Sequence, residues 1–260
     1  MAYARARLHL YRRNETMIRF SIDRWAAWSP NITKPSDWLN WLSSPTPVAQ
    51  NYDITPALTE MPAMMRRRVD RLGRMALQTA YWGMADSPSC PVVFASRYGD
   101  ISRSVGMLRQ LAEKEPMSPT SFSMSVHNAI GALFSISRDD VNAYTAIAAG
   151  EETVEAAFTE ALGLLADGEN AVLVVYYEEP LPELFAHFSE QPDFPRAWAC
   201  RLIRSGFEGI TLLSRKSSEE STKVSLPPDM LALRFLISND IAYEHKVGTK
   251  TWTWQRTNYD

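Results

Sequence analysis

The chain has 260 residues, of which 45% are hydrophobic and 22% charged, so it is long enough to bury a large core. Its net charge of −3 argues against a dedicated nucleic-acid-binding protein, and no apolar run is long enough for a membrane span. The two cysteines, Cys90 and Cys200, are too few for a disulfide framework and lack the spacing of metal ligands, which predicts a cytoplasmic protein without a metal or cofactor.

Residues 1–16 are basic, have no acidic residue before Glu15, and lack the apolar segment of a signal peptide. At Met17 an alternating apolar pattern begins, with Ile18, Phe20 and Ile22 on one side of a predicted strand. We therefore predict that 1–16 is an extension and that 17–260 forms a single domain.

The next segments predict helices around a strand. Prolines interrupt 29–62, where only a short helix at 36–42 is expected, and apolar residues three or four apart then predict one helix over 63–86. The apolar run at 91–96 predicts a strand. A helix beginning near Asp100 follows, and 118–137 predicts a loop and a helix.

The segment 141–177 predicts a strand, a helix and a second strand. Apolar residues recur on one helix face, at Val154, Ala157, Phe158, Ala161, Leu162 and Leu165. Acidic residues in the first turns favour the helix macrodipole. The run 171–177 is apolar throughout, as in a strand buried on both sides, so the unit predicts a parallel crossover.

After 180, the alternating segment 196–216 predicts an antiparallel hairpin around Gly206 and Gly209. A helix over 227–240, with prolines at its start, and a final aromatic strand over 251–256 follow. Taken together, these elements predict a layered α/β fold with a mixed sheet.

The turn within 141–150 is the most informative feature. A strand, a turn of small residues and a helix can lift a catalytic nucleophile above a sheet, but the tip here is Ile147, which has no lone pair. Thr145 carries the only aliphatic hydroxyl in the turn, and threonine without a base or a free amino group is seldom a nucleophile. From spacing alone, the segment also fits an ordinary strand-to-helix turn.

Four segments in order resemble β-ketoacyl synthases. "TAIAAGEETVEAA" resembles the active-site elbow of that family with Ile147 at the cysteine position, and "FSMSVHNAIGALFSI" resembles the preceding segment, with Asn128 and Gly131. "MRRRVDRLGRMAL" and "VVFASRYGD" resemble an early helix and a strand with its glycine turn. The resemblance covers about residues 60–180 and implies a thiolase-like α/β/α fold, truncated to the N-terminal half with a reduced C-terminal part at 181–260.

The departures from the family concern its chemistry. Condensing enzymes of this type need two histidines from their second half, and neither His187 nor His245 stands in a matching glycine-rich context. His9 lies in the extension, and His127 fits a packing or capping role in a helix better than that of a base. The resemblance therefore implies a non-catalytic chain-length-factor subunit of the aryl-polyene type, one that forms a heterodimer with an active β-ketoacyl synthase and serves an acyl carrier protein.

The same resemblance suggests two sites. The helix after the glycine turn would line the acyl tunnel with Ile101, Ser104, Val105 and Leu108, although this face also fits ordinary core. The strand entering the elbow, Asn142, Ala143, Tyr144 and Thr145, would pair with the partner subunit.

A basic cluster, Arg66, Arg67, Arg68 and Arg71, is either a solvated helix face or a landing patch for an acidic carrier protein. Two other functions stay open from the sequence: a thioesterase or decarboxylase of carrier-bound thioesters that uses Thr145 or His127, and a self-associating scaffold without acyl chemistry.

Overall fold

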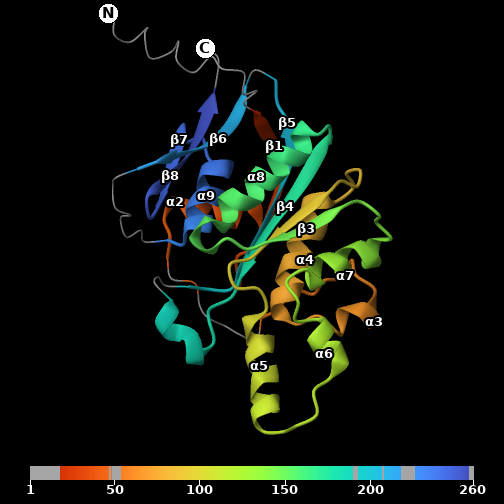
Figure 1. The fold of residues 1–260 in the computed structure, drawn as a ribbon. Helices are drawn as coiled ribbons and strands as arrows, with labels where there is room; N and C mark the ends of the chain where they lie inside the picture. The colour runs from red at the N-terminus through yellow and green to blue at the C-terminus, as the bar shows by residue number, and fades with distance from the viewer. Residues whose placement is uncertain are drawn as a thin grey trace, which may run out of the picture.

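The computed structural model describes residues 18–46, 48, 54–189, 193–206, 208–217 and 226–257. Its strands form one eight-stranded sheet in the order β3-β2-β4-β5-β1-β6-β8-β7 (Figure 1). They are β1 (Phe20–Trp28), β2 (Val92–Ala95), β3 (Tyr144–Ile147), β4 (Ala171–Glu178), β5 (Arg196–Arg204), β6 (Gly209–Lys216), β7 (Ala242–Val247) and β8 (Lys250–Thr257). The predicted extension at 1–16, and Met17 itself, lie outside the described residues.

One end of the sheet is parallel. β2 pairs in parallel with β3 on one side and with β4 on the other, and helix α8 (Thr153–Ala166) connects the two outer strands. The predicted parallel crossover over 141–177 is therefore confirmed. Its two strands are not neighbours, because β2 lies between them, a point that the periodicity of 141–177 could not reveal.

The predicted hairpin at 196–216 is wrong. Both of its segments are strands, but β5 and β6 do not pair with each other, because the N-terminal strand β1 lies between them and pairs antiparallel with both. The ladder between β1 and β5 runs from Phe20 opposite Arg204 to Trp28 opposite Ala197. Alternating side chains identify a strand and its buried face, but they do not identify its neighbour.

Helices cover both faces of the sheet, which confirms the α/β/α layering. On one face, α8 packs with α2 (Pro35–Ser43) and α9 (Pro228–Ile237), both close to their predicted positions. On the other face lie α4 (Arg71–Met84) and α7 (Ala129–Arg138). Strand β4 serves both cores, because Val174 points to the first and Val175 to the second.

The predicted helix over 63–86 is interrupted. It consists of α3 (Ala63–Arg66) and α4, separated by residues 67–70. Asp70 begins α4 as its N-cap, with the backbone N–H of Gly73 donating to its carboxylate at 2.9 Å. The apolar residues keep their helical spacing across this break. The periodicity alone therefore predicted one continuous helix and did not reveal that Asp70 caps a second one.

Two helices extend away from the sheet at the bottom of Figure 1: α5 (Ile101–Ala112) and α6 (Pro119–Ser123). Two 3₁₀ segments, η1 (Gly150–Glu152) and η2 (Glu183–Phe188), complete the described elements. None of the helices in the described ranges combines the length and the apolar character needed to cross a membrane.

The C-terminal hairpin of β7 and β8 packs against the elbow helix. The Trp254 ring lies 4.8 Å from that of Phe158 in α8, and Glu155 of α8 accepts hydrogen bonds from His245 at 2.9 Å and Trp254 at 3.4 Å. Strand β7 was not predicted, because its polar sequence "AYEHKV" gives no clear apolar alternation. The hairpin thus completes the core on the α8 side of the sheet.

Candidate functional site

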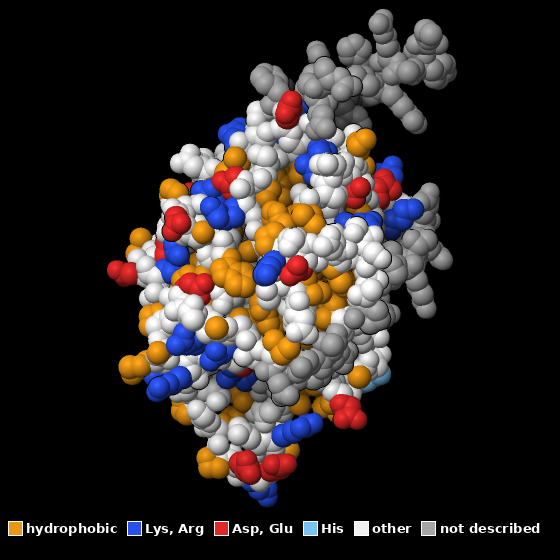
Figure 2. All heavy atoms as spheres, turned by 180° about the vertical axis from the view of Figure 1, so that it is seen from behind, with side chains coloured by type: hydrophobic (Ala, Val, Ile, Leu, Met, Phe, Trp, Pro, Cys, Tyr) orange, Lys and Arg blue, Asp and Glu red, His pale blue; other side chains and the backbone are white. Residues whose placement is uncertain are grey.

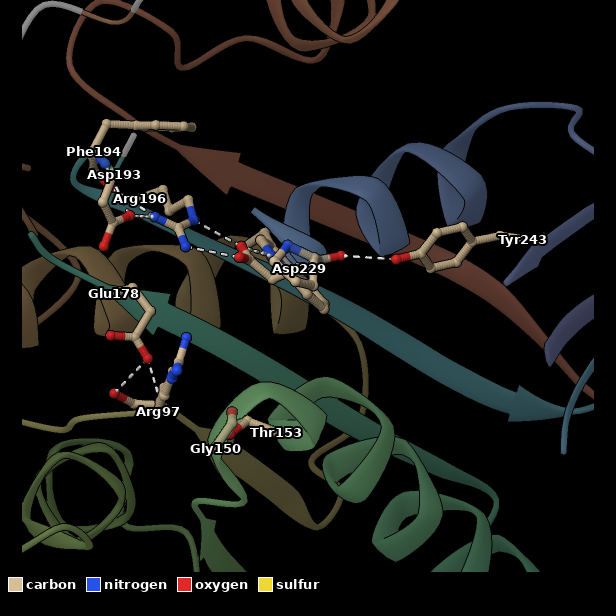
Figure 3. A network of polar contacts seen from close by, with 12 residues as sticks. Arg97, Gly150, Thr153, Glu178, Asp193, Phe194, Arg196, Asp229 and Tyr243 are labelled. Carbon is tan, nitrogen blue, oxygen red and sulfur yellow. Dashed lines mark hydrogen bonds and ion pairs between the residues drawn. The ribbon is translucent and has the colours of Figure 1, made fainter. Parts of the chain in front are cut away.

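The turn between β3 and α8 is stabilised by one threonine. Gly150 has a φ of +59°, a conformation that favours glycine, and the Thr153 hydroxyl donates to its carbonyl oxygen at 2.7 Å (Figure 3). The same hydroxyl accepts a hydrogen bond from the N–H of Ala149 at 3.0 Å. This N–H is therefore already occupied and is not free to stabilise an oxyanion.

Ile147 stands at the end of β3, at the tip of the elbow. Its side chain packs partly into the core on the α8 face. Its carbonyl oxygen accepts a hydrogen bond from the backbone N–H of Ser96 at 3.2 Å and lies 3.2 Å from His127 Nε2. The structure thus places a hydrocarbon side chain at the end of the strand that leads into α8, and this side chain cannot act as a nucleophile.

His127 packs between the tip and the glycine turn. A Cβ added at Gly99 would lie only 2.7 Å from His127 Nδ1, and Gly99 has a φ of +60°. The imidazole is therefore held against two stretches of backbone, in agreement with a packing role. Thr145 lies in the β3 ladder opposite Val93, and within the described residues no hydrogen bond joins it to His127 or to another base.

The remaining histidines and the cysteines lie away from the elbow tip or are buried. The His187 ring lies against that of Phe188 in η2 in a tilted arrangement, with ring centroids 4.0 Å apart, and His245 is bonded to Glu155. His9 lies outside the described residues. Burial raises the pKa of the thiols of both Cys90 and Cys200, so neither is a thiolate at neutral pH.

Glu178, which the sequence analysis did not single out, holds the turn beside the elbow. Its Oε1 accepts hydrogen bonds from the Ser96 hydroxyl at 3.1 Å and from the backbone N–H of Arg97 (Figure 3). The Ser96 hydroxyl accepts the N–H of Gly99 at 2.8 Å. Burial raises the pKa of Glu178 to about 8, so the carboxyl is mostly protonated at neutral pH. Its position directly after a buried strand was the signal available in the sequence.

A second group of carboxylates lies at the base of α5. Arg103 bridges Asp70 and Asp100, with 2.7 Å between its Nε and Asp100 Oδ2. Burial, together with hydrogen bonding to and repulsion by Asp70, raises the pKa of Asp100 to about 6. The pKa of Asp70 is lowered, because hydrogen bonds from its neighbours outweigh the effect of burial.

These residues line a pocket next to the elbow. Its walls combine the carboxylates and His127 with apolar side chains: Val69, Asp70, Gly73, Gly99, Asp100, Arg103, Met124, Val126, His127, Ile130, Leu133 and Tyr177. No group of three or more His, Cys, Asp or Glu side chains suited to a metal ion occurs among the described residues.

The predicted tunnel residues lie along α5 but do not form a closed wall within this chain. Val105 is buried, Ile101 and Ser104 are half-buried, and Leu108 is 61% exposed. Other large apolar side chains of this region are also exposed, namely Leu111, Met117, Phe122 and Val126. Figure 2 shows further hydrophobic side chains gathered near the middle of the face turned away from the view of Figure 1.

The predicted interface strand lies at an edge of the sheet. Asn142 and Ala143 are exposed, whereas Tyr144 and Thr145 are half-buried. The N–H of Val92 donates to Ala143 and that of Ser96 to Ile147. Because hydrogen-bonding residues alternate in a parallel ladder, the backbone groups of Tyr144 and Ala146 point away from β2, toward the open edge.

The predicted arginine patch is divided between two environments. Arg67 and Arg68 are exposed, whereas Arg66 donates to the Leu58 carbonyl oxygen at 3.0 Å and Arg71 forms an ion pair with Glu179. The break between α3 and α4 causes this division, because the four side chains do not share one helix face.

Comparison with known proteins supplies independent context. Residues 38–255 match the family model of the beta-ketoacyl synthase N-terminal domain. The solved complex of a ketosynthase, ApeO, with its chain length factor, ApeC, from Xenorhabdus doucetiae contains a similar chain, with a TM-score of 0.80 and 26% identity over 92% of this chain and 100% of that chain. No curated protein sequence matches the chain.

Two more distant structures show the fold alone. The ishigamide ketosynthase/chain length factor matches with a TM-score of 0.59 and 16% identity, over 77% of this chain and 68% of that chain. A beta-ketoacyl synthase from Burkholderia phymatum STM815 matches with a TM-score of 0.57 and 13% identity, over 79% and 66% of the two chains.

Proposed function

The chain belongs to the family of β-ketoacyl synthase N-terminal domains, and from this premise we propose that it is a non-catalytic chain-length-factor subunit. In this proposal it forms a heterodimer with an active β-ketoacyl synthase in aryl-polyene, polyketide or fatty-acid-type biosynthesis. The partner carries the growing acyl chain on its own cysteine, and this chain shapes the far end of the acyl tunnel.

The observation that carries the proposal is Ile147 at the tip of an otherwise intact elbow. Acyl transfer through a covalent intermediate needs a thiolate or an activated hydroxyl, and an isoleucine side chain can be neither. The Ala149 N–H is occupied by Thr153, and His127 packs against the Ile147 carbonyl oxygen. These contacts support a turn that serves assembly rather than acyl transfer.

Two features of the surface support a protein partner. Strand β3 leaves the backbone groups of Tyr144 and Ala146 open at the sheet edge, and Ile136 and Val141 beside it are 67% and 98% exposed. Exposed apolar side chains next to a free strand edge favour association with another chain. The similar chain from Xenorhabdus doucetiae belongs to a ketosynthase–chain length factor complex, which supports a ketosynthase as the partner.

The exposed face of α5 supports a tunnel that the two subunits complete together. Leu108, 61% exposed in this chain, would contact the acyl chain once the partner is in place. Lengthening or shortening the tunnel by a few methylene groups changes the binding free energy of the acyl chain by about 1–3 kcal/mol. This is enough to change the chain length at which elongation stops. We expect Leu108→Ala to lengthen and Leu108→Trp to shorten the products of the reconstituted pair. Unchanged product length in both variants would rule out this role for Leu108.

The carrier-protein patch also belongs to the proposal. Arg67 and Arg68 are the exposed members of the cluster, so they are the side chains an acidic carrier protein would meet. Reversing both to glutamate should slow carrier-dependent turnover more at low salt than at high salt, because salt screens exposed charges. A rate that shows no salt dependence would favour a solvated surface without a docking role.

Two experiments separate the proposal from the alternatives. Co-expression with a ketosynthase that has an intact cysteine and two histidines should give a stable complex and polyene or polyketide product. The purified chain alone, given malonyl- and acyl-carrier thioesters, should show neither hydrolysis nor decarboxylation. Turnover by the lone chain would favour the thioesterase or decarboxylase alternative, and a chain that associates only with itself would favour the scaffold.

A further inference from the structure

Helix α5 has little hydrophobic anchoring of its own. Of its residues only Val105 is buried, whereas most of α4 is buried against the sheet. Burial of a single valine side chain contributes little to the position of a helix that extends away from the sheet (Figure 1). The direction of α5 must therefore depend on the polar contacts at its first turn.

These contacts form one continuous clamp between two helices. Asp100 is the N-cap of α5, and it accepts hydrogen bonds from the backbone N–H of Arg103 at 2.9 Å and from the Arg103 Nε at 2.7 Å. Asp70 is the N-cap of α4, where Gly73 donates to one carboxylate oxygen, and the other accepts from the Arg103 guanidinium. A single guanidinium thus connects the first turn of α5 to the first turn of the firmly packed α4.

The clamp matches the properties of arginine. A guanidinium presents donors in a rigid fork that fixes the direction of two carboxylates, whereas a lysine ammonium is a point charge on a flexible stem. The side chains of Arg103, Asp100 and Asp70 are 19%, 13% and 37% exposed, so the Asp100 half of the bridge is the better shielded from water. The apolar residues Val69, Ile130 and Tyr177 line the same pocket and add to this shielding.

We propose that Arg103 is a positioning residue that fixes the direction of α5 relative to α4, and through α5 the length of the acyl site. The effect of Arg103 on the acyl site rests on the proposed function, in which α5 lines the tunnel. Its effect on the direction of α5 rests only on contacts within this chain. Arg103 is placed to act through Ile101, Ser104 and Leu108 on the same helix rather than to touch the acyl chain.

The clamp is tested on the full chain alone. Arg103→Met keeps a long apolar side chain and removes both ion pairs, and Arg109→Met makes the same change in the last turn of α5, where Arg109 is exposed and makes no ion pair in the described part of the chain. Hydrogen–deuterium exchange over 101–112 should be about tenfold faster in Arg103→Met, while α4 and Arg109→Met stay unchanged. Equal exchange in the two variants would overturn the clamp.

The second readout is product length in the complex with a ketosynthase. If the clamp fixes the length of the acyl site, Arg103→Met should broaden the distribution of product chain lengths without abolishing turnover. Arg103→Lys should give a distribution between those of the wild type and Arg103→Met. An active complex with an unchanged distribution would overturn the role of Arg103 in chain length. A wild-type chain that yields no product with the ketosynthase would count against the proposed function, whereas exchange over 101–112 would still decide the clamp.

Discussion

The two edges of the sheet differ in chemistry. At one edge, β3 carries the uncharged sequence "YTAI", and the exposed Val141 and Ile136 lie beside it. At the other edge, β7 carries Glu244, His245 and Lys246, and Glu244 forms an ion pair with Arg215. Charged side chains protect a free edge from pairing with another strand, and their absence leaves β3 open. The difference supports the proposal that the partner binds at the β3 edge.

The β7 edge is also tied to the core by side chains. His245 bonds to the buried Glu155 of α8, and Lys250 donates to Glu152 at 2.8 Å, next to the elbow. These contacts give the acidic first turns of α8 specific partners, in addition to the favourable macrodipole expected from the sequence. The last hairpin thus stabilises the elbow helix from within the chain, whereas β3 stays at the sheet edge as the proposed interface strand.

The largest expected effect concerns the stability of the β7 side. Trp254 is fully buried against Phe158, so Trp254→Ala should lower the free energy of unfolding by about 3–5 kcal/mol in chemical denaturation. Trp252→Ala, in the same strand but partly exposed, should cost less than half as much. Equal losses would mean that the hairpin does not pack as a part of the core.

A matched pair of prolines compares the two edges directly. Ala146→Pro removes an N–H that points to the open β3 edge, and Ala242→Pro makes the same change in β7, whose N–H at 242 also points outward because Arg256 donates to Ile241. We expect Ala146→Pro to weaken binding to a ketosynthase by about 2 kcal/mol, roughly thirtyfold, in titration calorimetry. Ala242→Pro should leave binding unchanged, and equal weakening by both prolines would refute the assignment of the interface to β3.

A smaller effect concerns the turn next to β3. The pKa of Glu178 is raised from 4.5 to about 8, so the unfolded chain loses this proton at a lower pH than the folded state does, and the free energy of unfolding falls as the pH rises from about 4.5 through about 8. Between pH 7 and pH 9 the wild-type chain should lose about 1 kcal/mol of unfolding free energy relative to Glu178→Gln, which does not titrate. The free energy of unfolding of both proteins is measured by chemical denaturation at each pH. An equal change in the two proteins between pH 7 and pH 9 would contradict the protonated state of Glu178.

Much of the fold could be predicted from local patterns. The parallel crossover around α8 followed from helical and strand periodicities within one short segment, and α9 and β8 followed from proline and aromatic signals. The insertion of β1 between β5 and β6 could not, because strand order depends on contacts between distant segments. The polar strand β7 was not predicted either, because its sequence lacks the apolar alternation that identifies a strand.

The site was predicted in part. The proposed loss of the nucleophile rests on one residue type, Ile147, and it stays a prediction from the sequence. The clamp of Asp70, Arg103 and Asp100 could not be predicted, because helices α4 and α5 bring together residues about 30 positions apart without a sequence motif. Glu178 left a weaker signal, an acidic residue at the end of a buried strand, and its partner Ser96 directly follows a different strand.

The source of the reactive thiol can be measured directly. The purified complex with a ketosynthase, incubated with an acyl-carrier thioester, is separated into its subunits, and the intact mass of each is determined. The mass of this chain should stay unchanged while the ketosynthase gains one acyl group, because Ile147 occupies the position of the nucleophile. An acyl group on any side chain of this polypeptide would contradict its assignment as a non-catalytic subunit.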